Sequence, residues 1–366
     1  MTYRFLDLAD SSDAPRLWNT IVAASPEAWI WATYSTYLFR LAYMKAKSVL
    51  VADRSFVLLH EERPCGLAPV PLSRDRETGE LSSAYDEAPL PWPMIIPGIC
   101  DTREAERLIF DEVERRSLEA GASRLLLMLA PPNPDIELFA RFVHIVRERC
   151  FIDTGYMSHC IDLSNNTLRA VRERYRRYVR RLHSQYDMQI IEAKDVTAEL
   201  ATLYMQLHVK DAGGVFRPLD TYERQIDQIR VGEAFFVSAR RRREGKVVGM
   251  LLVQVLKGAA YDSSVAVDPE FEDEGVSYLL KWRAIEHLIS TGVRHYELGR
   301  AAVTPTFLWQ PSAKNYGISF FKDGWSRGHF KPVWVGEKFY SEKALVSFFE
   351  RKKSDLIRYF SLSESA

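Results

Sequence analysis

The 366 residues are 47% apolar and 27% charged, with 49 basic against 49 acidic side chains, so we expect two globular domains and no overall attraction to polyanions. The chain has no apolar run of membrane-spanning length, no signal-peptide pattern at its start, and four cysteines without C-x-x-C spacing. These features exclude a membrane span and predict a cytoplasmic protein with no metal and no cofactor.

The first part of the chain predicts a hairpin, a helix and a strand. An apolar strand at 56–59 enters a charged turn and returns through Leu72. A helix over 102–120 ends at Gly121, the residue expected at a left-handed helix stop, and the strand 124–130 follows. The intervening stretch 82–99 is rich in proline and aromatic rings, which keeps a loop extended. Such a loop either shapes an acceptor pocket or packs on the sheet.

A boundary is expected near residues 153–155. We predict a first domain over 1–155, a second over 156–340, and a C-terminal helix and tail over 341–366. An amphipathic stretch at 133–150 precedes this boundary, and a strand at 156–163 follows it.

A strongly basic helix is predicted over 167–182. Val171, Tyr175, Tyr178 and Leu182 form its buried stripe. Arginine grips phosphate with two hydrogen bonds, so a nucleic-acid or nucleotide-binding face is one interpretation. A solvated face paired with acids elsewhere is the other, and the sequence favours neither. The arginines that flank the stripe are Arg169, Arg172, Arg174, Arg176, Arg177, Arg180 and Arg181.

The second part repeats the order of the first. Strands at 247–256 and 259–267 are followed by an acidic loop, a helix over 276–290 and a strand over 295–300. Because hairpin, helix, glycine stop and strand recur in the same order, we predict two copies of one α/β unit. This order resembles GNAT acyltransferases, whose loop before the helix is glycine-rich and holds the pyrophosphate of acyl-CoA. Here that loop, 268–275, carries carboxylates that would repel a diphosphate.

Two further segments carry polar side chains among apolar ones. On the strand 259–267, Tyr261 and Ser263 are expected on the face that lines a ligand crevice, with a hydrogen-bonded core as the alternative. The segment 316–325 alternates apolar residues around Lys322, which either places its ammonium on an oxyanion or a phosphate or is a lysine at a strand end that points outward. Arg300 ends the strand 295–300, where an open α/β unit borders its ligand.

These features together resemble the Fem-type (FemA/FemB/FemX-like) transferases. The residues that carry the resemblance are the repeated unit, the Tyr-Glu-Leu-Gly-Arg strand at 296–300 and the Phe-Lys pair at 321–322. The resemblance implies that Phe321 and Lys322 lie at the acyl-transfer centre and that Arg169 to Arg181 form a family-type basic helix. Family members that use aminoacyl-tRNA lack the CoA pyrophosphate loop, in agreement with the acidic loop. The long helical arm of some members is missing here, which favours the smaller relatives.

The resemblance implies a two-domain α/β fold with a cleft between tandem GNAT-like domains. It predicts transfer of an aminoacyl group, from aminoacyl-tRNA, to a small-molecule amine, with Lys322 and Arg300 binding oxyanion or phosphate. Either Asp86 or the substrate itself is expected to take the proton of the amine, and the residues expected to bind substrate are Tyr85, Trp92, Tyr261, Ser263 and Tyr316. Two alternatives stay open: an acyl-CoA or acyl carrier protein donor, and a non-catalytic scaffold.

Overall fold

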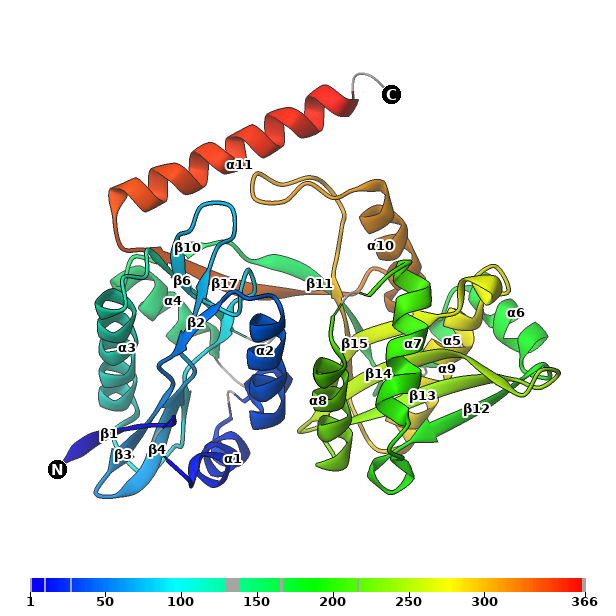
Figure 1. Cartoon of the computed structure of the whole chain (residues 1–366), viewed down its shortest axis with the longest axis horizontal. Helices are drawn as coiled ribbons and strands as arrows, with labels where there is room; N and C mark the ends of the chain where they lie inside the picture. The colour runs from blue at the N-terminus through cyan, green and yellow to red at the C-terminus, as the bar shows by residue number, and fades with distance from the viewer. Residues whose placement is uncertain are drawn as a thin grey trace. The chain divides into compact units, whose positions relative to one another are not determined.

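The computed structural model describes residues 2–9, 11–26, 28–129, 138–164, 167–215 and 217–363. The chain forms two compact units (Figure 1). The first unit comprises Met1–Met157, Ala302–Gly317 and Pro332–Ala366, and the second comprises Ser158–Ala301 and Ile318–Lys331. The predicted domain ranges are contiguous in sequence, whereas these units are not.

The second unit contains one mixed sheet. Its strand order is β12 (Tyr186–Ile191), β13 (Ala234–Arg241), β14 (Lys246–Leu256), β15 (Ala259–Val267), β16 (His295–Arg300) and β11 (Tyr156–Asp162). Neighbouring strands are antiparallel except β15 and β16, which are parallel and joined through α9 (Val276–Ser290). The bounds of β15, α9 and β16 are those predicted from the sequence.

Helices cover both faces of this sheet because apolar side chains alternate along its strands. Phe235, Val237 and Leu251 pack with the helix α6 (Glu173–Leu182) and with α9. Phe236, Met250 and Leu252 pack on the opposite face with α7 (Leu200–Ala212) and α8 (Leu219–Arg230). The short helices η2 (Ala193–Asp195) and η3 (Pro269–Phe271) lie in the connections.

The first unit has two sheets. The first sheet runs β1 (Tyr3–Asp7), β3 (Phe56–His60), β4 (Arg63–Ala68) and β8 (Met94–Ile95). The second runs β17 (Phe330–Phe339), β9 (Arg124–Leu129), β6 (Leu81–Ser83), β5 (Pro71–Arg74) and β2 (Leu50–Asp53), with β7 (Leu90–Pro91) on β9 and β10 (Ile152–Asp153) on β17. Strands β6 and β9 are parallel and joined through α3 (Thr102–Glu119), as β15 and β16 are through α9. The remaining helices are α1 (Ala14–Ala24), η1 (Ile30–Ala32), α2 (Tyr34–Ala46) and α4 (Leu138–Glu148).

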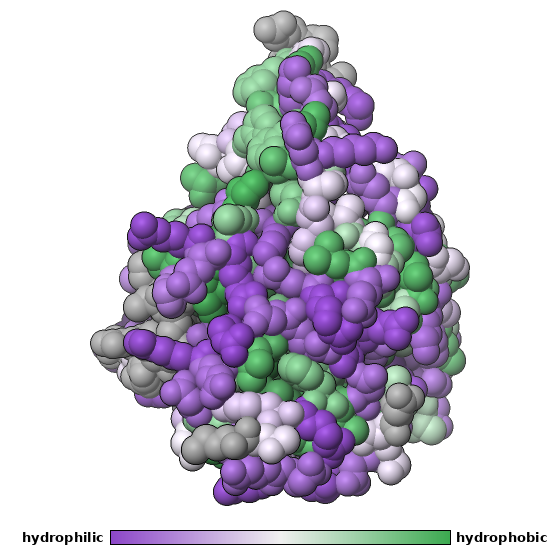
Figure 2. Space-filling view, turned by 90° about the vertical axis from the view of Figure 1, so that its left-hand side faces the viewer, coloured by the Kyte–Doolittle hydropathy of each residue, from purple (hydrophilic) through white to green (hydrophobic). Residues whose placement is uncertain are grey.

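The tail forms the predicted amphipathic helix, α11 (Glu342–Ser363). Ala344 and Phe348 are buried, and the Phe348 ring centroid lies 5.1 Å from that of Phe339 in β17. Figure 2 shows a face on which hydrophilic residues predominate, with apolar residues along one edge of α11 at its top. Among the described helices, none combines the length and apolar character that a membrane crossing requires.

The segment around Lys322 is a helix, not the alternating, strand-like segment expected from the sequence. Helix α10 spans Ala313–Ser326. Ser312 and Asn315 form a reciprocal cap at its start, since Ser312 Oγ accepts from Asn315 N at 3.2 Å and Asn315 Oδ1 accepts from Ser312 N at 2.9 Å. Phe321 and Trp325, four residues apart, pack their rings on Tyr175 of α6. The cap and the ring packing therefore stabilise a helix here, although the apolar pattern indicates a strand.

The basic helix is also not the single helix expected over 167–182. It divides into α5 (Thr167–Ala170) and α6, because Arg172 is extended, with φ −49° and ψ 130°. Three contacts with α10 hold Arg172 there: its N–H donates to Gly324 O at 3.0 Å, its guanidinium pairs with Asp323 at 2.8 Å, and it lies 4.4 Å from the Phe320 ring centroid. Val179, rather than Tyr178, completes the buried stripe of α6.

Gly324 permits the close contact between α10 and α6. A Cβ at this position would lie 2.0 Å and 2.3 Å from two carbons of the Tyr175 ring. We predict that Gly324→Ala lowers the free energy of unfolding by about 1–3 kcal/mol, the usual range for overpacking a core. The midpoint of urea denaturation measures this change.

Gly317→Ala in the same helix is the matched control. A Cβ at Gly317 meets nothing within 4 Å, so the variant should gain up to about 1 kcal/mol from helix propensity. Equal behaviour of the two variants would contradict the packing account.

Candidate active site

Strands β15 and β16 separate in the middle of the second-unit sheet. Their parallel pairing covers Ala259–Tyr261 against His295–Glu297. Beyond it, each strand carries a β-bulge against its other neighbour: Ser263 is the extra residue in β15, and Leu298 is the extra residue in β16. Bulges are common beside active sites because they redirect side chains. The period-two argument that placed Tyr261 and Ser263 on one face does not hold across such a bulge.

Lys322 of α10 and Tyr261 of β15 meet at Gly299, just past this separation. A Cβ on Gly299 would lie 3.3 Å from Lys322 Nζ and 3.7 Å from Tyr261 Oη, and the Gly299 φ of +87° also favours glycine. Burial lowers the pKa of Lys322 below its usual range, with Lys281 acting in the same direction, and Asp262 and Glu297 oppose the shift. Lys322 and Tyr261, which the sequence analysis names as separate candidates, therefore both lie close to Gly299.

Glu297 of β16 is a buried carboxyl that titrates near neutral pH. It is 6% exposed, and Ser158 Oγ donates a hydrogen bond to its Oε1 at 2.7 Å. Burial raises the pKa of Glu297 to about 7, against the opposing effects of Ser158, Lys322 and Lys331. A carboxyl with this pKa can accept a proton and return it near physiological pH.

A buried ion pair lies next to these groups. Lys281 of α9 donates to Asp262 of β15 and, at 3.2 Å, to the hydroxyl of Tyr296. Burial lowers the pKa of Lys281, while Asp262 opposes that shift. We call Tyr261, Asp262, Lys281, Glu297, Lys322 and Ser158 the Lys322 cluster.

His159 of β11 links α10 to the sheet through two hydrogen bonds. Its Nδ1 lies 3.0 Å from Ser326 Oγ and its Nε2 lies 2.9 Å from Ser319 Oγ. Burial, together with the positive charge of Lys322, lowers the pKa of His159 to about 4. The imidazole is therefore neutral at pH 7 and has a positioning role for the helix that carries Lys322.

The N-terminus of α9 lies under two stacked tyrosine rings. Tyr178 and Tyr278 have ring centroids 4.7 Å apart at an interplanar angle of 1°. A Cβ on Gly275, the residue before α9, would lie 3.2 Å and 3.0 Å from these rings. The rings occupy space beside the position where GNAT loops hold a pyrophosphate.

Two of the carboxylates in the acidic loop are neutralised by cations. Asp268 is buried and accepts from Lys210 at 3.0 Å and from Lys246 at 2.7 Å. Glu274 pairs with Arg241 and accepts from the hydroxyl of Tyr186. The loop is therefore less negative than its sequence indicates, and its exposed acids are Glu270, Glu272 and Asp273.

The arginines of α6 outnumber their acidic partners. Glu173 pairs with Arg176, with Arg177 at 3.6 Å and with Arg180 at 2.8 Å. Arg181 donates to the carbonyl of Glu274 at 3.2 Å, beside the start of α9. One carboxylate for three guanidinium groups leaves a positive surplus on α6, which also carries Arg174 and Arg181, while Arg169 belongs to α5. Arg172 is instead held by α10.

Other predicted site residues have structural partners. Phe321 packs among Tyr175, Tyr278 and Trp325. Arg300 ends β16, opposite Ser158 in the β11 register, and is partly buried.

Four predicted residues belong to the first unit. Tyr85 is buried, Asp86 pairs with Lys47 at 2.8 Å, and the Trp92 ring packs edge-on against Phe110. Tyr316 hydrogen-bonds to Tyr359 of α11, which raises its pKa.

Sequence reasoning missed Glu297, Ser158, His159 and the pair Asp262–Lys281. The available signal was an acid inside an apolar strand, since a carboxylate is rarely buried without a partner. Within the described ranges, no group of three or more His, Cys, Asp or Glu side chains is arranged to hold a metal ion.

Comparisons with known proteins agree with this architecture. Residues 169–305 match the family model described as "Acetyltransferase (GNAT) domain". The crystal structure of FemX has a TM-score of 0.65 at 11% identity, covering 95% of this chain and 100% of that chain. L-PGS from Bacillus licheniformis has a TM-score of 0.59 at 10% identity, covering 93% and 95%. No curated protein matches the sequence of this chain.

A third solved structure is the C-terminal domain (DUF2156) of a putative lysylphosphatidylglycerol synthetase from Agrobacterium fabrum. Its TM-score is 0.58 at 13% identity, with 92% of this chain and 95% of that chain covered. These matches confirm the Fem-like, tandem GNAT fold expected from the sequence. The GNAT match and the fold together point to an acyltransferase enzyme.

The pair Asp262–Lys281 should be structural. Lys281→Met leaves the Asp262 carboxylate buried without its ammonium partner, so we expect a loss of roughly 3–5 kcal/mol in the free energy of unfolding. Urea denaturation measures the loss. The double variant Lys281→Met/Asp262→Asn removes both charges and should recover most of it; a double variant as unstable as the single one would contradict the pairing.

Proposed function

We propose that the protein transfers an aminoacyl group from aminoacyl-tRNA to an amine and forms an amide. The observation that carries the proposal is the burial of Lys322 together with Glu297, a carboxyl with a pKa of about 7, where β15 and β16 separate. An aminoacyl ester is already activated, so the enzyme has to orient the amine, stabilise the oxyanion and move one proton.

In the proposed reaction the amine nitrogen attacks the ester carbonyl carbon. The carbonyl oxygen becomes an oxyanion, which the Lys322 ammonium stabilises. The attacking nitrogen gives a proton to the Glu297 carboxylate while the new C–N bond forms. The oxyanion then collapses, the ester C–O bond breaks, and the 3′-oxygen of the tRNA leaves as a hydroxyl with the proton that Glu297 returns, which restores the carboxylate. Glu297 replaces Asp86 as the proposed proton acceptor because Asp86 is bound to Lys47.

Two features support a tRNA donor over CoA. The arginine surplus on α6 suits the phosphates of a nucleic acid. The tyrosine rings beside Gly275 fill space near the usual pyrophosphate position, and exposed acids adjoin it. Because aminoacyl-tRNA is made in the cytoplasm, the proposal implies a cytoplasmic enzyme.

The proposed acceptor is a small-molecule amine, either a peptidoglycan precursor or a natural-product intermediate, as the Fem-type resemblance implies. Arg300 is proposed to steer a phosphate or carboxylate of a substrate. Tyr261 and Ser263 of the second unit are proposed substrate-binding residues, and in the first unit the proposed ones are Tyr85, Trp92 and Tyr316.

An acyl-CoA or acyl carrier protein donor is the second candidate. The match of residues 169–305 to a GNAT acetyltransferase model favours it, and an acidic carrier protein would also suit the arginine face.

The deciding experiment supplies total tRNA charged with labelled amino acids, together with the small-molecule fraction of a cell extract. We expect labelled amide that disappears after RNase treatment and is not formed when free amino acids replace charged tRNA. RNase-resistant product driven by acyl-CoA or an acylated carrier would instead establish the second candidate.

Loss of two exposed arginines should weaken binding of the donor. The side chains of Arg177 and Arg180 are 74% and 70% exposed. For Arg177→Gln/Arg180→Gln we expect the slope of log affinity for tRNA against log salt to fall by about 2, one for each lost phosphate contact. Filter binding across a salt series measures the slope.

Arg224→Gln is the control, because Arg224 is an exposed arginine of α8 that pairs with Asp227 as Arg180 pairs with Glu173. A fall of about 1 in the slope for this single variant, the same effect per lost arginine, would show that the effect is not specific to α6.

The rate of the proposed reaction should follow the protonation of Glu297. Its pKa is raised to about 7, so the carboxyl holds its proton and cannot accept another at lower pH. We expect kcat/KM to rise with pH up to about 7 and to level off above it. Glu297→Gln should lower the constant value of kcat/KM above pH 7 roughly 10²- to 10⁴-fold and abolish the rise of kcat/KM with pH.

Lys322→Met provides an independent readout, since Lys322 lowers the pKa of Glu297. Removal of Lys322 should reduce kcat/KM and should also move the rise of kcat/KM to higher pH. If kcat/KM of Glu297→Gln still rises with pH up to about 7, Glu297 is not the proton acceptor.

A further inference from the structure

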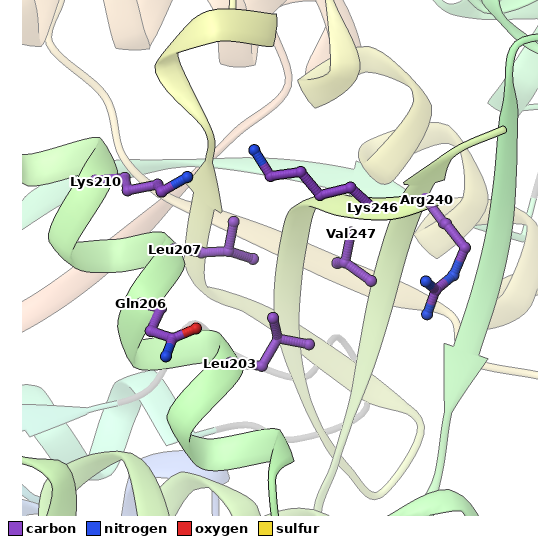
Figure 3. A pocket seen from close by; sticks show the side chains of 7 residues that line it. All are labelled: Leu203, Gln206, Leu207, Lys210, Arg240, Lys246 and Val247. Carbon is purple, nitrogen blue, oxygen red and sulfur yellow. The ribbon is translucent and has the colours of Figure 1, made fainter. Parts of the chain in front are cut away.

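A cavity lies in the second unit, between α7 and the β13–β14 hairpin (Figure 3). Its volume is about 330 Å³, within the range of small-molecule sites. Helix α7 supplies one side, and the hairpin supplies the other. The lining residues are Leu203, Gln206, Leu207, Lys210, Arg240, Lys246 and Val247.

The cavity has a positive surplus. Lys210 and Lys246 direct their ammonium groups toward each other at one end, as Figure 3 shows, and share the carboxylate of Asp268. Arg240 donates to the carbonyl of Gly245. Because a carbonyl carries no net charge, the positive charge of Arg240 is not neutralised. Glu270 lies 3.9 Å from Lys246 but is 75% exposed, so solvent screens it. Two ammonium groups thus share one buried carboxylate, while Arg240 lies on the other side of Val247 with its guanidinium directed away from them (Figure 3).

The rest of the lining is apolar. Leu203 and Leu207 of α7 face Val247 of β14 between the cations (Figure 3). Gln206 adds one amide, which can donate and accept. An apolar wall beside an ammonium pair fits a ligand that joins an anionic head to an apolar body.

This cavity is separate from the Lys322 cluster. Strand β15 connects the two places: Asp262 belongs to the cluster, and Asp268, six residues later, binds the cavity lysines. At about 3.3 Å per residue, six extended residues span roughly 20 Å. A ligand in the cavity would therefore not reach Lys322 or Glu297.

We propose that this cavity is a second binding site, for a small amphiphilic anion: a phosphate monoester or a carboxylate on an apolar body. The head binds Lys210 and Lys246, and the body packs on Leu203, Leu207 and Val247. Because the site lies away from the transfer centre, the inference does not depend on the proposed reaction.

Calorimetric titration of the full chain tests the proposal with phenyl phosphate and phenylacetate as probes. We expect saturable binding of at least one probe, about tenfold tighter than inorganic phosphate or benzyl alcohol, because head and body each contribute. The tighter of the two probes identifies the head group. Inorganic phosphate binding as tightly as both probes, or an absence of saturable binding, would overturn the proposal.

Charge variants locate the site. Lys210→Gln and Lys246→Gln should each weaken the tighter probe about tenfold, and in each variant the remaining lysine still pairs with Asp268. Arg243→Gln removes the same charge from an exposed residue of the same hairpin, outside the lining, and should leave the affinity unchanged. Equal weakening by all three variants would show diffuse electrostatic attraction and overturn the proposal. Unchanged thermal unfolding verifies that each variant folds.

Discussion

The pairing of Lys281 with Asp262 is the interaction on which the rest of the site depends. A single charge buried in a sheet interior is costly, whereas a paired and hydrogen-bonded one is tolerated. With these two charges matched, Lys322 and Glu297 can occupy the same desolvated space, and burial moves their pKa values toward each other. Bulges at Ser263 and Leu298 and the glycine at 299 give the side chains room. A site built in this way combines a cation and a proton acceptor, both preorganised away from water.

Charge on the surface of the second unit differs from its formal distribution along the chain. The loop 268–275 is rich in carboxylates, yet Asp268 and Glu274 are matched by Lys210, Lys246 and Arg241. The positive charges of the α6 arginines are not neutralised in this way, because the single carboxylate of Glu173 pairs with three of them. A chain with zero formal net charge therefore retains a basic face, beside the tyrosine rings that adjoin the start of α9.

The sequence predicts the regular elements of the second unit well, because β15, α9 and β16 have clear periodicity and end at turn residues. Helix α10 could not be predicted, since Gly317 and Gly324 and the alternating apolar residues hide its period; the Ser312 cap and the ring of Tyr175 decide its structure. The same limit applies to the site. Local patterns predict Tyr261 and Arg300, and the Fem-type resemblance implies Lys322. Glu297 depends on Ser158, 139 positions away, and on a bulged register that no local pattern reveals.

The interleaved course of the chain has a practical consequence. Residues 302–317 and 332–366 return to the first unit, while 318–331, with Lys322, belong to the second. No single cut separates the units intact: a stop after residue 301 would remove Lys322 from its own unit and β17 from its partner β9. Because the second unit consists of two chain segments, moving it intact between relatives would require four junctions, with residues 318–331 transplanted together with 158–301.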